Sequence, residues 1–169
     1  MTDAASTSLT PLAQSFLRLV PIATTFAISM CHFDQHLVFS SFLPAKAPPH
    51  DKPSMVSHVM REYIQGALPL VIALEFASYG CFAANVYYRL PQWKWYGFGL
   101  VCSLTHLVNA PYSWKLLTAI KRGDEVTAKK EGKPVKTTAA LEEFVRMNKL
   151  RLILTELPLM AIVIGAGVL

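Results

Sequence analysis

Four long apolar segments dominate this chain and restrict what it can fold into. They cover residues 12–42, 63–88, 95–120 and 141–169, and each reaches the roughly 20 residues that a helix needs to cross the apolar core of a bilayer. Backbone groups in lipid must be hydrogen-bonded within the protein, and none of the segments alternates as a strand would, so we expect helices. The predicted fold is all-α: a single integral membrane domain over 1–169, in which four transmembrane helices form an antiparallel up-and-down bundle.

Composition and charge support this interpretation and predict an orientation. Of the residues, 53% are apolar and only 16% are charged. The net charge is +5, but the cations do not form the water-exposed face, interleaved with aromatic residues, that a nucleic-acid site needs. No nucleic-acid partner is therefore expected. Nine cations lie in the first and third connections and two in the second, which predicts that both termini lie on the non-cytoplasmic side. The expected membrane is that of the endoplasmic reticulum. The nine are Lys46, Lys52, Arg61, Lys121, Arg122, Lys129, Lys130, Lys133 and Lys136, and the two are Arg89 and Lys94.

Each expected helix also carries polar side chains along one face. Ionisable groups inside a membrane are costly and usually face a bundle interior or a water-filled cavity. At 100° per residue, the first helix places its polar residues within an arc of about 60°. The four faces are Arg18, Thr25, Ser29, His32 and His36; Glu75, Ser78, Phe82 and Asn85; Cys102, His106, Asn109 and Ser113; and Asn148, Arg151, Thr155 and Glu156. Either they join the helices by buried pairs, such as Arg151 with Glu75 or Glu156, or they surround a site.

The histidines favour a site. His32 and His106 are candidate general bases, because imidazole exchanges protons near neutral pH. His32 and His36 have the i, i+4 spacing that lets two imidazoles share a metal, which His106 and Glu75 would complete. The glutamate of the H-E-x-x-H motif is missing, so a metal is compatible with this pattern but is not expected.

Two short motifs resemble a known family. The last segment contains Phe144-x-x-x-Asn148-x-x-Arg151, which is similar to the aromatic-x3-Asn-x2-Arg signature of small four-helix membrane proteins that include the fungal anthrone oxygenases. The third segment ends in a stretch that resembles the family's Pro-x-Asn-x-x-Leu, with Ser113 where the asparagine is usual. The plan of four spans with a charged loop before the last is similar across nearly the whole chain.

The resemblance implies an enzyme of polyketide-type secondary metabolism that oxidises an anthrone to an anthraquinone with molecular oxygen, without a metal or flavin. It implies catalytic roles for Asn148 and Arg151. A histidine base would form the enolate of such a substrate, and Arg151 with Asn148 or Asn109 would stabilise its oxygen. His36, Glu75, Asn109 and Ser113 are the expected substrate-binding residues. The expected partners are a hydrophobic small molecule and the bilayer, and the bundle is compatible with a homo-oligomer.

Other interpretations remain open. The chain could isomerise or cyclise a hydrophobic biosynthetic intermediate, or it could be a non-catalytic four-helix membrane subunit whose polar residues only join helices. A membrane glutathione transferase would need a basic site for an anionic peptide, for which Lys115, Lys121 and Arg146 are available, but the Arg and Asn pattern of that group is absent.

Overall fold

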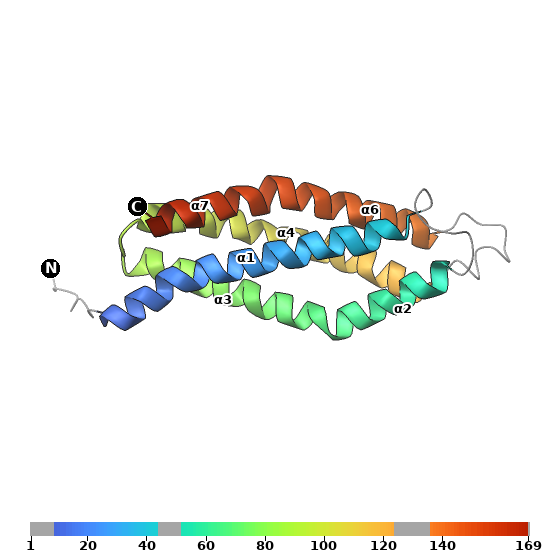
Figure 1. The fold of residues 1–169 in the computed structure, drawn as a ribbon, viewed down its shortest axis with the longest axis horizontal. Coiled ribbons are helices and arrows are strands. Elements are labelled where there is room, and N and C mark those ends of the chain that lie inside the picture. The colour runs from blue at the N-terminus through green and yellow to red at the C-terminus, as the bar shows by residue number, and fades with distance from the viewer. Residues whose placement is uncertain (1–8, 44–51, 124–135, 169) are drawn as a thin grey trace.

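A computed structural model describes residues 9–43, 52–123 and 136–168. Over these ranges the elements are helices and no strand occurs, which confirms the all-α prediction. In chain order they are α1 (Pro11–Ser41), α2 (Lys52–Gln65), α3 (Ala67–Tyr87), α4 (Trp93–Arg122), α6 (Lys136–Arg151), the π-helix η1 (Leu152–Glu156) and α7 (Leu157–Val168) (Figure 1).

Three helical segments are long and apolar enough to cross a membrane: Pro11–Ser41, Ala67–Tyr87 and Thr137–Gly167. The chain therefore has the helices of a membrane protein, but the expected count of four spans is not confirmed within the described residues. The helix that falls short is α4. Its 30 residues suffice in length, and polar residues such as His106 and Asn109 lower its mean hydropathy. Among the cations used to orient the bundle, Lys46, Lys129, Lys130 and Lys133 lie outside the described residues.

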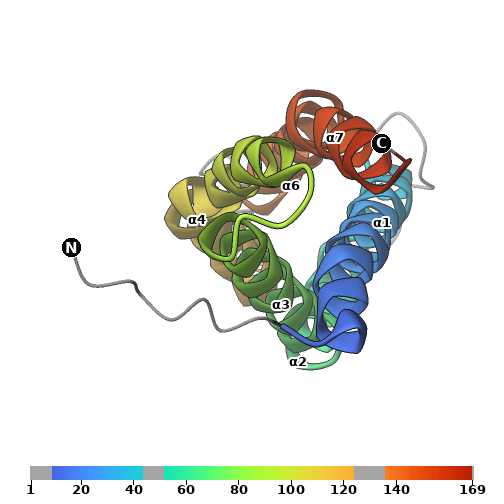
Figure 2. The same ribbon diagram turned by 90° about the vertical axis from the view of Figure 1, so that its left-hand side faces the viewer.

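The helices pack around a common centre, with α1 and α4 on opposite sides (Figure 2). Helix α1 packs against α3 on one flank and against α6 and α7 on the other. Helix α4 packs against the same three helices and also against α2. Side chains that point inward from α1, α3, α4 and α6 can therefore meet at one level of the bundle.

The expected helix over residues 63–88 is divided in two. Helix α2 ends at Gln65 and α3 begins at Ala67, with a visible bend between them (Figure 1). Pro69 has no N–H for the carbonyl of Gln65, and its ring would clash with that carbonyl in a continuous helix. The N–H of Gly66 instead donates to the carbonyl of Glu62 at 2.8 Å, which closes the last turn of α2.

A second proline coincides with the π-helix. Pro158 cannot donate to the carbonyl of Leu154, and just before it the backbone widens so that the N–H of Leu157 bonds the carbonyl of Leu152. Such wide turns often occur at functional sites. Glu156, the last residue of η1, is completely buried.

Two apolar cores lie on either side of a polar level. Along α1, Phe39 belongs to the first core and Ile22 packs against the second, while His32 lies between them. In the second core the helices approach closely, because a Cβ on Gly99 would lie 2.7 Å from the ring of Phe82. The first core contains Phe39, Val56, Met60, Leu116, Leu117, Ile120, Ala140, Leu141, Phe144 and Val145, and the second contains Phe82, Tyr96, Leu159, Val163 and Ala166.

Candidate functional site

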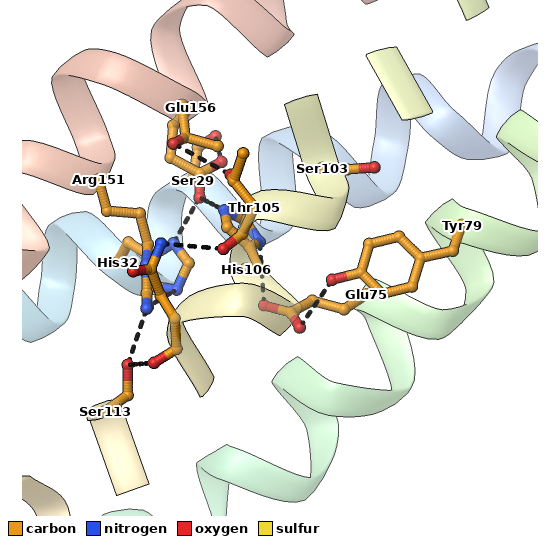
Figure 3. Close-up of polar contacts among 12 residues, drawn as sticks. Ser29, His32, Glu75, Tyr79, Ser103, Thr105, His106, Ser113, Arg151 and Glu156 are labelled. Carbon is orange, nitrogen blue, oxygen red and sulfur yellow. Dashed lines mark hydrogen bonds and ion pairs between the residues drawn. The ribbon is translucent and has the colours of Figure 1, made fainter. Parts of the chain in front are cut away.

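Five ionisable side chains meet at the polar level, and each comes from a different element (Figure 3). They are His32 of α1, Glu75 of α3, His106 of α4, Arg151 of α6 and Glu156 of η1, and together they are called the charge cluster below. Glu156 is 0% exposed, and the two histidines are 2% and 4% exposed. Charges this deep are stable only if they are paired with one another.

Glu156 is the hub of the charge cluster. Its Oε1 lies 2.6 Å from Nδ1 of His32 and 3.0 Å from Nε2 of His106. Its Oε2 accepts a hydrogen bond of 3.0 Å from the hydroxyl of Ser29. A single carboxylate thus joins α1, α4 and η1.

His106 lies between two carboxylates. Its Nδ1 is 3.1 Å from Oε1 of Glu75, and its Nε2 faces Glu156. These are close ion contacts rather than well-directed hydrogen bonds. Tyr79 donates to the other oxygen of Glu75 at 3.2 Å. Because both ring nitrogens face carboxylate oxygens, we assign His106 as the imidazolium, which has two N–H donors.

His32 has a different arrangement. Its Nε2 lies 3.2 Å from Nη1 of Arg151, and because a guanidinium only donates, this nitrogen must accept. The proton of the neutral ring is therefore on Nδ1 and is donated to Glu156. Arg151 also donates from Nη2 to the hydroxyl of Ser113 at 3.0 Å.

These assignments balance the charges of the cluster. Arg151 and the His106 imidazolium contribute two positive charges, Glu75 and Glu156 contribute two negative charges, and His32 is neutral. A cluster with zero net charge avoids most of the cost of placing ions in a low-dielectric interior.

Three members of the charge cluster could also offer ligands to a metal. One ligand atom each of His32, His106 and Glu156 lies within 4.8 Å of the others, and two histidines with one carboxylate are a common donor set. Coordination through Nδ1 of His32 would move the ring proton to Nε2, where it would face the N–H groups of Arg151. The hydrogen-bond pattern of these side chains thus fits an ion-pair network better than a metal centre.

A cavity of about 130 Å³ lies beside the charge cluster. His32, Glu75, His106, Arg151 and Ser113 form its polar wall, and Gln35 and Tyr63 lie at its edge. Burial raises the pKa of the Tyr63 hydroxyl, so this group stays protonated. The remaining lining is apolar and consists of Leu68, Val71, Ile72, Ala110, Trp114, Leu117 and Phe144.

The structure gathers part of the predicted site and not the rest. His32, His106, Glu75, Ser113 and Arg151 line the cavity. Asn148, His36 and Asn109 do not line it. Asn148 is fully buried behind Gln35 and donates to the Oε1 of Gln35 at 3.2 Å. His36 is half-buried, and Asn109 is exposed and donates to the carbonyl of Thr105.

Three participants were not among the predicted site residues: Glu156, Gln35 and Tyr63. Glu156 shares a helix face with Arg151, so the sequence offered it only as an ion-pair partner. Gln35 and Tyr63 carried no recognisable signal, because neither belongs to a polar stripe or to a motif.

One relative was found by comparison of the sequence with known proteins. A protein of Mollisia scopiformis named "Probable epoxidase scpX" is 26% identical over 148 residues, which cover 84% of this chain and 87% of that protein. No family model matches the chain, and no solved structure matches it. The relative fits the resemblance to the anthrone oxygenases without confirming it.

Proposed function

We propose that the chain is a membrane-embedded oxygenase-type enzyme of polyketide-type secondary metabolism. It oxidises a hydrophobic, anthrone-like phenolic substrate to a quinone, with molecular oxygen as co-substrate and without a cofactor. The observation that carries the proposal is a chain of hydrogen bonds from Glu156 through His32 to Arg151, and His32 and Arg151 both line the cavity. The carboxylate of Glu156 orients the imidazole of His32 through Nδ1, and Nε2 of the same ring is an acceptor.

Of the two candidate bases, the geometry supports His32. As an imidazolium with both nitrogens facing carboxylates, His106 has no lone pair for a substrate proton. The lone pair of His32 Nε2 accepts a hydrogen bond from Nη1 of Arg151, and it becomes available to a substrate proton once the substrate draws that N–H away. The carboxylate of Glu156 then stabilises the cation that forms when this nitrogen takes up a proton. A positioned general base contributes about 10²- to 10⁴-fold to the rate.

Arg151 is suited to hold the developing oxyanion. It lines the cavity, and its Nε–H has no hydrogen-bond partner among the described residues. Its Nη1–H must turn from His32 to the substrate oxygen before Nε2 takes up a proton, because that nitrogen has only one lone pair. A preorganised donor of this kind is worth roughly 3 to 4 kcal/mol in the transition state. Asn148 does not line the cavity, and we assign it a positioning role through Gln35.

The proposed reaction balances without a further reductant. His32 removes a proton from the methylene group of the anthrone, and the resulting enolate transfers an electron to oxygen. Carbon–oxygen bond formation gives a hydroperoxide, which loses water to leave the second carbonyl. Anthrone and oxygen thus yield anthraquinone and water, and the substrate itself supplies all the electrons.

The name of the relative favours epoxidation of a carbon–carbon double bond as a second candidate. That reaction places one oxygen atom of O₂ in the product and needs two electrons from an added reductant to reduce the other atom to water. The products differ by mass: a quinone gains one oxygen and loses two hydrogens, whereas an epoxide only gains the oxygen.

We also propose that α4 crosses the membrane beside the three apolar spans. It packs along α3, α6 and α7, and it brings His106 to the same level as the other ionisable groups. Four crossings place both termini on the same side, and the distribution of Lys and Arg favours the non-cytoplasmic side, which we propose to be that of the endoplasmic reticulum membrane.

The proposal is tested with His32→Gln in microsomes, assayed for oxygen-dependent quinone formation from an anthrone. Glutamine keeps hydrogen bonding but is not a base, so the rate is expected to fall at least about 100-fold. His58→Gln, the same change at an exposed position of α2, is the matched control and is expected to keep the wild-type rate. Protein abundance is followed by immunoblot. Wild-type activity in His32→Gln at normal abundance would show that His32 is not the base.

A further inference from the structure

The cavity beside His32 is too small for a fused tricyclic molecule. It measures about 130 Å³, whereas an apolar protein cavity of roughly 150 Å³ holds a single benzene. In the described conformation the first cavity therefore accommodates one ring. A larger substrate needs further space that is continuous with it.

A second cavity of about 200 Å³ lies next to the first. It is bounded by α1 on one side and by the end of α2 and the start of α3 on the other. The two cavities share Gln35, Tyr63 and Val71. Its lining, mostly apolar, consists of Cys31, Asp34, Gln35, Val38, Phe39, Val59, Tyr63, Ala67 and Val71.

The second cavity opens on the outer surface of the bundle. Val38 at its rim is 46% exposed, and Asp34 and Ala67 are also exposed. Two of the flanking helices, α1 and α3, are long and apolar enough to cross a membrane. The second cavity therefore lies between two helices that could cross a membrane, and its lining residues Tyr63 and Ala67 flank the bend between α2 and α3.

Two of the residues that line both cavities are hydrogen-bonded to each other. Gln35 donates from Nε2 to the hydroxyl of Tyr63 at 2.8 Å, and its Oε1 accepts from Asn148. Tyr63 belongs to the last turn of α2, directly before the break between α2 and α3, so no continuous helix extends beyond it at this point. Movement of the Tyr63 side chain away from Gln35 would join the two volumes.

We propose that the two cavities form one binding site for an elongated amphipathic phenol that enters from the bilayer. Its phenolic ring occupies the first cavity, beside His32 and Arg151, and its apolar remainder, whether fused rings or an alkyl chain, occupies the second cavity between α1 and α3. Gln35 and Tyr63 separate as the ligand enters. The assignment of the phenolic end rests on the proposed function, whereas the position of the apolar remainder follows from the cavities alone.

Binding of 4-methylphenol and 4-nonylphenol to the purified protein in nanodiscs tests the proposal. In the wild type, 4-nonylphenol is expected to bind at least about tenfold more tightly, because its chain leaves water for the second cavity. Empty nanodiscs are titrated in parallel to subtract partition into the lipid. Ala67→Trp fills the rim of the second cavity and is expected to abolish the difference. Ala77→Trp, the same change at an exposed position of α3 that lines neither cavity, is expected to keep it.

Photolabelling of the wild type with a phenol that carries a diazirine at the end of its alkyl chain gives a second readout that needs no variant. Label is expected on the peptides that contain Val38, Val59 or Ala67. Equal chain-length dependence in the wild type and in Ala67→Trp, or label found only on other lipid-facing surfaces, would overturn the proposal. Both measurements are independent of turnover, so they can fail while His32→Gln still loses oxidation, and the reverse also holds.

Discussion

Replacement of Glu156 by glutamine is the sharpest perturbation of the charge cluster. Glutamine has nearly the same shape as glutamate but carries no charge, so the net charge of the charge cluster changes from zero to +1. The contacts with His32, His106 and Ser29, at 2.6, 3.0 and 3.0 Å, all depend on carboxylate oxygens. The amide oxygen of glutamine can still face the two histidines and its NH2 can donate to the hydroxyl of Ser29, so the change lies in the count of charges, which becomes two positive against one negative.

The expected loss of stability follows from this count. Removal of one partner from a buried ion pair costs about 3 to 5 kcal/mol, because the remaining charge is left without compensation. Loss of the proton from His106 would relieve part of this cost, so we expect Glu156→Gln to fall at the lower end of that range. Quinone formation is also expected to drop, because His32 loses the carboxylate that stabilises its protonated form.

The assay is reversible unfolding of the purified protein in mixed micelles with increasing denaturing detergent. Glu143→Gln is the matched control, since Glu143 is a carboxylate of α6 that pairs at 2.7 Å with Arg146, whose side chain is 70% exposed. Exposed pairs of this kind contribute little to stability. Glu156→Asp, which keeps the charge on a shorter side chain, should lie between the wild type and Glu156→Gln. Equal unfolding free energies for Glu156→Gln and Glu143→Gln would refute the charge balance.

Three further results are expected. Activity should survive treatment with a strong chelator, because the donor set fits an ion-pair network; loss of activity that returns with one divalent metal would overturn the cofactor-free mechanism. Arg151→Leu should abolish quinone formation while membrane insertion, measured by carbonate extraction, persists; normal turnover would remove Arg151 from the mechanism. In a chain with its native cysteines replaced, membrane-impermeant labelling should reach Thr10→Cys and Pro91→Cys from one side and Arg122→Cys from the other. Labelling of all three from one side would contradict the four-span topology.

The helices and much of the polar level could be predicted from the sequence. The length of the apolar segments alone indicated the long helices, and helical spacing placed Ser29 and His32 on one face, which is buried. Pro69, three residues after Gly66, indicated a disturbance of the helix there. Proline is also tolerated inside transmembrane helices, so the sequence could not distinguish a kink from a break.

The pairing across helices could not be predicted. A rotation of 100° per residue relates neighbours on one helix, but it does not say which faces of different helices meet. Asn109 shares a stripe with His106 and yet is exposed, because the inward direction of α4 is set by its contacts with α3, α6 and α7. The roles of the two histidines depend on which partners face each ring nitrogen, and only the assembled bundle reveals these partners.

The distribution of the charge cluster over five elements has a consequence for biogenesis. During synthesis the helices leave the ribosome in order, so His32, Glu75 and His106 enter the membrane before Arg151 and Glu156 do. Glu75 and His106 can pair with each other, but until the C-terminal helix arrives His32 lacks both Glu156 and Arg151, and His106 lacks Glu156. We therefore expect a nascent chain arrested before residue 136 to be retained by chaperones or degraded, and stable accumulation of the protein to depend on residues 136–168, which form α6, η1 and α7.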